Sequence, residues 1–246
     1  MEGTPGMKPR LIAGGFAAGL PGVIAVNLMI VPTMLAGKAL SVPMWVAQLA
    51  STLQSCVMLA IALCVGAFLA PKVGLRTPLL TAWASHTPLV NAGKPLVVPG
   101  LAGGALGAAL ILLIAQFTPP EMKTDVQIPA LARVLYGGIT EELVMRWGFM
   151  TLVAWILRRL FQCGVAKPSA AVMIAAIILA ALMFGALHLP AAALLVKQLT
   201  PGVIAWVMVG NASFSLIAGW LYWKAGLEAA IIAHITTHIG VLLFTM

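Results

Sequence analysis

Long apolar runs separated by short polar breaks organise the chain. A transmembrane helix needs about 20 predominantly apolar residues, and most of these runs approach or exceed that length. One further stretch, at 128–161, indicates a long helix that carries charged residues inside an apolar sequence. The pattern predicts an all-α, polytopic membrane protein with about seven to eight transmembrane helices. The other runs lie at 11–35, 43–70, 101–117, 168–189, 201–224 and 227–246.

The pattern weakens between 71 and 100, where polar residues and prolines interrupt short apolar runs. His86, Asn91 and Lys94 are among the interruptions. Such a sequence is typical of an interfacial or re-entrant segment, and we do not expect it to cross the membrane by itself.

Composition supports the membrane prediction and limits the partners. Charged residues make up only 8% of the 246 residues, whereas soluble domains have about 25%. The formal net charge is +8, but the basic residues are scattered between apolar runs, which fits contact with anionic lipid headgroups. The chain lacks a basic patch with stacking aromatic residues, so we expect a lipid bilayer and no nucleic acid as its partner. With seven crossings and a cytoplasmic amino terminus, most basic residues would lie on the cytoplasmic side.

No repeat or low-complexity tract divides the sequence. We therefore predict a single membrane domain over 1–246, with amino-terminal helices in 1–127 and a core in 128–246. Cys56, Cys64 and Cys163 do not have metal-type spacing, and we interpret them as packing residues.

The most informative stretch contains Glu141, Glu142 and Arg146 inside the 128–161 helix. A charged side chain at bilayer depth costs roughly 2.5 to 3.5 kcal/mol on insertion scales, so such residues are usually paired or face a polar cavity. At about 100° per residue, Glu142 and Arg146 lie about 40° apart on an α-helix, while Glu141 lies about 140° from Arg146. The spacing predicts that Glu142 pairs with Arg146 and that Glu141 remains free.

Histidines recur at helical spacing in the later apolar runs. His188 follows Phe184 by four residues, and His238 follows His234 by four. On a helix, His234 and His238 share one face, from which two imidazoles can hold a metal or a reacting oxygen. Phe184 would cover His188. A single histidine such as His188 is as often a satisfied hydrogen bond between helices, but three of them with an unpaired glutamate predict a functional site.

The ordered set of Glu-Glu-x-x-x-Arg, Phe-x-x-x-His and His-x-x-x-His resembles the CAAX-protease and bacteriocin-processing family, also called CPBP or Abi. These proteins are intramembrane endopeptidases. The resemblance covers about the last 120 residues, and it implies an active site buried between the carboxyl-terminal helices. It also implies an integral, multi-pass protein, which we expect in the plasma membrane of a prokaryote.

The resemblance implies a role for each motif residue. Glu141 matches the glutamate that activates water, and Glu142 with Arg146 matches the supporting ion pair. His188 and His234 match the histidines that position water or metal and stabilise the oxyanion. The substrate implied is a prenylated or otherwise membrane-associated peptide, cleaved near its carboxyl terminus.

His238 departs from the family pattern, which most often has asparagine there. An asparagine amide donates to an oxyanion, whereas a neutral imidazole can also bind a metal. His188, His234 and His238 with a water would complete a tetrahedral zinc, with Glu141 as the base. A metalloprotease and a metal-free glutamate protease both remain open from the sequence.

Two other classes of protein also remain open. A proton-coupled transporter places Glu and His at bilayer depth too, although the internal symmetry of transporters is missing here. A non-catalytic bacteriocin-immunity or scaffold protein is the second alternative. Other intramembrane proteases fit less well, since the sequence has no H-E-x-x-H and its only aspartate, Asp125, falls in an expected loop.

Overall fold

The computed structural model describes residues 6–123, 126–165 and 167–245, and Asp125 lies outside them. The described residues form helices joined by short loops, without any strand, so the all-α prediction is confirmed. The helices are α1 (Met7–Ala25), η1 (Val26–Ile30), α2 (Val31–Leu35), α3 (Met44–Leu69), η2 (Ala70–Val73), α4 (Pro78–Ala84), α5 (Leu89–Ala115), η3 (Pro120–Met122), α6 (Ala130–Ala132), η4 (Arg133–Glu141), η5 (Leu143–Met150), α7 (Thr151–Phe161), α8 (Ala170–Leu187), α9 (Leu189–Leu195), α10 (Pro201–Lys224) and α11 (Leu227–Thr245).

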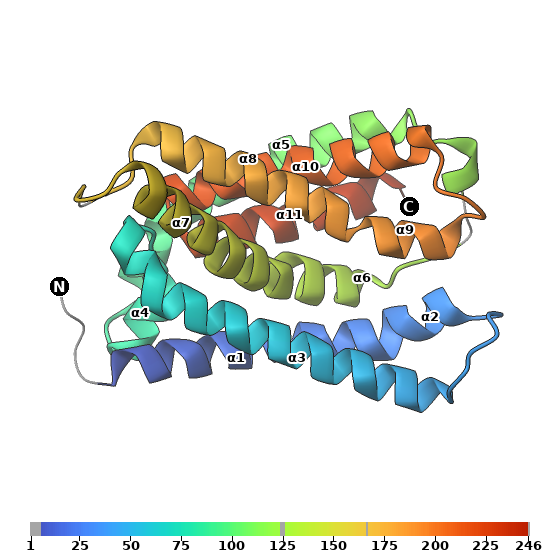
Figure 1. Ribbon diagram of the computed structural model, residues 1–246, viewed down its shortest axis with the longest axis horizontal. Coiled ribbons are helices and arrows are strands. Elements are labelled where there is room, and N and C mark those ends of the chain that lie inside the picture. The colour runs from blue at the N-terminus through green and yellow to red at the C-terminus, as the bar shows by residue number, and fades with distance from the viewer. Residues whose placement is uncertain (1–5, 124–125, 166, 246) are drawn as a thin grey trace.

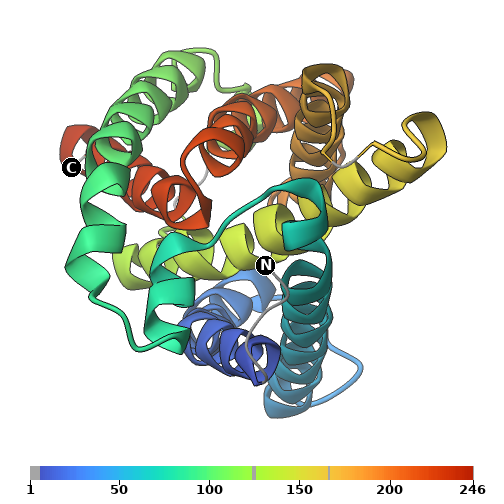
Figure 2. The same cartoon turned by 90° about the vertical axis from the view of Figure 1, so that its left-hand side faces the viewer.

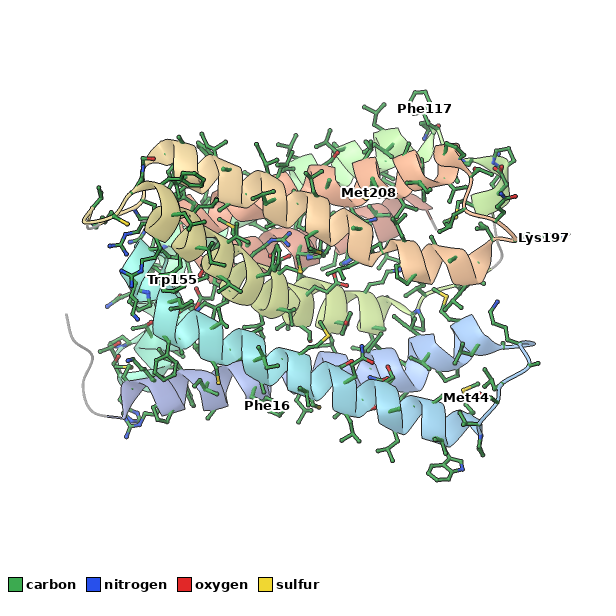
Figure 3. All side chains as sticks on the ribbon, viewed as in Figure 1. Phe16, Met44, Phe117, Trp155, Lys197 and Met208 are labelled. Carbon is green, nitrogen blue, oxygen red and sulfur yellow. The ribbon has the colours of Figure 1, made fainter. Side chains whose placement is uncertain are left out.

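Six helices within the described residues are long and apolar enough to cross a membrane. Large apolar side chains also cover the outside of the bundle; Phe117, for example, projects away from it (Figure 3). The protein is therefore an integral, multi-pass membrane protein, as predicted, although the expected count of seven to eight helices is not confirmed. The six are Met7–Leu35, Met44–Val73, Leu89–Ala115, Ala170–Leu195, Pro201–Lys224 and Leu227–Phe244.

The structure of the segment 71–100 agrees only in part with the predicted interfacial or re-entrant segment. Helix α4 has seven residues, too short to cross a bilayer. The second half of the segment is the start of α5, which begins at Leu89 and not at residue 101. This helix continues through Pro95 and Pro99. Prolines are tolerated in such a helix because packed neighbours compensate for the lost backbone hydrogen bonds. Here α5 packs closely along α11, where Thr237 donates a hydrogen bond to the Gly104 carbonyl at 3.1 Å.

One continuous helical run from Ala130 to Phe161 lies at the centre of the bundle; we call it the site helix. It contacts α1 and α3 on one side and α8, α10 and α11 on the other. Figures 1 and 2 show it between these two groups of helices. The predicted long helix over 128–161 is therefore present, and its neighbours come from both halves of the chain.

The site helix differs from a regular α-helix over η4 and η5, where the backbone hydrogen bonds have π-type, i to i+5, spacing. Two threonine side chains form hydrogen bonds with the same five-residue spacing. Thr140 and Thr151 each donate to the carbonyl five residues earlier, that of Leu135 and Arg146 respectively. Thr140 also donates to the Gly19 carbonyl of α1 at 2.7 Å. These bonds fix the rotation of the site helix against α1.

The loops at one end of the bundle are joined through basic side chains. Arg158 donates to the carbonyl of Lys72, and Arg76 donates to that of Lys224. Lys197 lies at the opposite end (Figure 3). The structure thus brings several basic residues together at one end of the bundle. That this end is the cytoplasmic one stays a prediction.

Candidate active site

A buried charged cluster forms the rear of the site. Glu142 Oε2 lies 3.1 Å from Arg146 Nε, and Glu142 Oε1 accepts a 2.8 Å hydrogen bond from His234 Nδ1 of α11. The Glu142–Arg146 pair has the distance of an ion pair without the angles of a hydrogen bond. All three side chains are buried. An unpaired charge here would be costly, so each group stabilises the others. The ion pair is the one that the spacing predicted.

His188 is oriented by the end of α8. Pro190 has no backbone N–H to continue the helix, and the His188 N–H bonds to Gly185 O, three residues back. The Phe184 carbonyl instead accepts a 2.7 Å hydrogen bond from His188 Nδ1. A carbonyl can only accept, so Nδ1 carries the proton and Nε2 of the neutral ring is an acceptor. The local break in the helix therefore sets the tautomer of His188.

Glu141 and His188 line the same pocket. His188 Nε2 lies 3.9 Å from Glu141 Oε1, and both side chains are partly exposed, at 32% and 19%. The cavity has a volume of about 290 Å³ and is mainly apolar. Glu142, by contrast, is completely buried, so the two adjacent glutamates have different surroundings. Other residues that line the pocket include Ser55, Met58, Tyr136, Thr140 and Phe184.

His234 and His238 lie behind this pocket and are not among the described residues that line it. Their rings stack at 4.7 Å between centroids, and Phe214 contacts His234 at 4.3 Å. The Phe184 ring lies edge-on to both His188 and His234, at 4.7 and 6.2 Å. Phe184 covers His188, as expected. His234 bonds to Glu142 through Nδ1, and His188 alone of the three predicted histidines lines the pocket within the described residues.

The histidines do not form a metal site as they are arranged. Within the described ranges, no three His, Cys, Asp or Glu side chains are placed to hold a metal ion. The His234 ring lies at only 21° to that of His238. Lone pairs of nearly parallel rings point side by side and not toward one ion. His188, His234 and His238 therefore do not fit the zinc that the sequence left open.

Three hydroxyl residues of the pocket, Tyr136, Thr140 and Ser55, were not predicted from the sequence. On an α-helix, Tyr136 and Glu141 would lie about 140° apart. In the π-type segment, residues five apart lie nearly above one another. No feature of the sequence indicates this register. Ser55 comes from α3, and its proximity depends on tertiary packing.

The comparison with known proteins agrees with the site. Residues 125–240 match the family model described as type II CAAX prenyl endopeptidase Rce1-like. The matched region contains the site helix, α8 and both histidines of α11. No curated protein and no solved structure matched the chain. Over residues 125–240, the chain is thus similar to the Rce1-like family of CAAX-type endopeptidases, which agrees with the family that the order of its motifs indicated.

Proposed function

We propose that the protein hydrolyses a peptide bond near the carboxyl terminus of a prenylated or otherwise membrane-associated peptide, with a water activated by Glu141. The observation that carries the proposal is that Glu141 and His188 line one mainly apolar pocket, with Oε1 and Nε2 3.9 Å apart. The Rce1-like match supports a CAAX-type intramembrane endopeptidase in general. The roles of this chain's own residues in the reaction are part of the proposal.

The proposed reaction uses the fixed tautomer of His188. Its Nε2 accepts a hydrogen bond from a water, and the ionised Glu141 accepts the other proton of the same water. The water oxygen forms a bond to the peptide carbonyl carbon while its proton moves to Glu141. Glu141 then gives this proton to the amide nitrogen, and the C–N bond breaks. The products are a new carboxyl group and a free amine.

The buried cluster supports this chemistry by holding Glu141 in place. Arg146 and His234 both contact Glu142, whose side chain is fully buried. Glu141, directly before Glu142 in the chain, is the one carboxylate among the described residues that line the pocket. We propose Glu141 and His188 as catalytic residues and Glu142, Arg146 and His234 as residues that position them. His238 acts on His234 through its stacked ring.

The pocket also supports the substrate class. Its walls come from α3, the site helix, α8 and α9, all within the helical bundle, and its surface is mainly apolar. A peptide held at the membrane by a lipid anchor would bring its carboxyl-terminal residues to this depth. The prenyl group is the anchor named in the family description, and it is the first one to test.

The experiment uses the full chain in lipid nanodiscs and a fluorogenic peptide with and without a farnesyl group. Wild type is compared with Glu141→Gln and with Glu121→Gln, a matched change in the exposed η3. We expect Glu141→Gln to reduce kcat by at least about 10²-fold and Glu121→Gln to leave it unchanged. In H₂¹⁸O, one labelled oxygen should enter the new carboxyl group.

Two outcomes would contradict the proposal. Unchanged cleavage by Glu141→Gln would remove the glutamate from the reaction. A folded wild type that cleaves no peptide of a broad prenylated and unprenylated panel would favour the immunity or transport alternatives.

A further inference from the structure

The proposed reaction requires a donor for the oxyanion that forms when water attacks the carbonyl. Preorganised N–H or O–H groups supply this stabilisation in acyl-transfer sites. The ring N–H of His188 is already donated to the Phe184 carbonyl, and that of His234 to Glu142. Neither His234 nor His238 lines the pocket of Glu141 in the described structure. His188, the one histidine among the described residues that line the pocket, therefore has no free N–H for the oxyanion.

Tyr136 is the candidate for this donor. It precedes Glu141 by five residues inside η4, whose i to i+5 hydrogen bonds place residues five apart on the same face. Both side chains line the same cavity. The phenol and the carboxylate thus extend from neighbouring turns of one helix into the space where the peptide carbonyl would lie.

The hydroxyl of Tyr136 is free to donate. The part of the chain that the structure describes offers it no hydrogen-bond partner, whereas the chain's other tyrosine, Tyr222, bonds Thr151 Oγ1 at 2.9 Å. Of the other hydroxyls that line the pocket, Thr140 donates to the Gly19 carbonyl of α1. Ser55 belongs to α3, a separate helix whose position relative to Glu141 is not fixed by a shared backbone.

We propose that Tyr136 is a further catalytic residue, whose O–H donates a hydrogen bond to the carbonyl oxygen as it becomes an oxyanion. This inference rests on the proposed function of the same pocket. The phenol proton stays on Tyr136 throughout, while the proton of the attacking water passes to Glu141 and then to the leaving nitrogen. The electron pair of the carbonyl moves to the oxygen and returns when the C–N bond breaks.

The test is Tyr136→Phe, which keeps the ring and removes only the hydroxyl. Loss of one oxyanion donor lowers kcat by about 10²- to 10³-fold. KM should not change, because the bond strengthens only in the transition state. Tyr222→Phe is the matched control, since it removes the only other phenol, which lies outside the pocket; we expect it to keep the wild-type kcat.

The outcomes separate this inference from the proposed function. Peptide binding is compared between the inactive Glu141→Gln variant and the double variant that also carries Tyr136→Phe. We expect equal affinities, and binding by the double variant also shows that it is folded. A Tyr136→Phe variant with wild-type kcat would overturn the role of Tyr136 while leaving Glu141 as the base. If Ser55→Ala lowered kcat and Tyr136→Phe did not, the donor would be assigned to Ser55. If Glu141→Gln retained activity, the proposed function itself would fail.

Discussion

His188 Nε2 lies 3.9 Å from Glu141 Oε1, and the other ring nitrogen of His188 is bound to the Phe184 carbonyl. The ring therefore presents an acceptor to the pocket and keeps a fixed orientation. A separation of this size is longer than a hydrogen bond, and catalytic contacts often tighten only when the substrate is bound. In the proposed reaction, the two side chains share one water.

We predict that His188→Ala lowers kcat by about 10²- to 10⁴-fold, because it removes a group that orients the attacking water. The fold should remain, since the side chain is 32% exposed. The measurement is peptide cleavage at saturating substrate. His86→Ala is the control, because His86 lies in the exposed turn after α4, and it should match wild type. Equal activity of the two variants would remove His188 from the mechanism.

The charged cluster leads to a prediction about stability. Arg146→Ala leaves Glu142 buried without its cationic partner, and breaking a buried pair in this way costs about 3 to 5 kcal/mol. The free energy of unfolding can be measured by titration with a denaturing detergent. Arg159→Ala is the matched change on the same helix. Arg159 is exposed and lies over the Trp155 ring, so its loss should cost less than about 1 kcal/mol. Similar losses for both variants would contradict the prediction.

Local spacing was sufficient to predict some of these contacts. Glu142 and Arg146 are four residues apart on one helix, and they pair in the structure even though the turns are π-type. The apolar runs predicted a multi-pass helical protein because length and composition decide that class. The start of α5 was missed, since Pro95 normally indicates an end or a kink, and only packing against its neighbours shows that the helix continues.

Contacts between distant segments could not be predicted from spacing. His234 and Glu142 are 92 positions apart, and their hydrogen bond depends on how α11 crosses the site helix. The place of Tyr136 depends on the π-type register of η4, which the apolar pattern does not distinguish from an α-helix. Spacing within one helix thus predicted the Glu142–Arg146 pair, whereas contacts between helices could not be predicted in this way.

The close crossing of α11 and the site helix leads to a third prediction. A Cβ atom built on Gly138 would lie 2.5 Å from Ile235 Cγ1, so Gly138→Ala should be destabilising by about 1 to 3 kcal/mol through overpacking. In the double variant with Ile235→Ala, the two effects should be less than additive because that change removes the clashing atom. Gly210→Ala is the control, since its nearest contact, to Ile114, is 3.9 Å. A destabilisation of Gly210→Ala equal to that of Gly138→Ala would contradict the steric explanation.

The arrangement of the histidines predicts that activity does not depend on a metal ion. The His234 and His238 rings are stacked, and within the described residues no three possible ligands are placed to hold an ion. Incubation with EDTA followed by gel filtration should therefore leave kcat unchanged. The metal content of the active fraction, measured by mass spectrometry, should be well below one zinc per chain. If EDTA abolished cleavage and Zn²⁺ alone restored it, the histidines would have to move together on binding, and the zinc interpretation would replace the metal-free one.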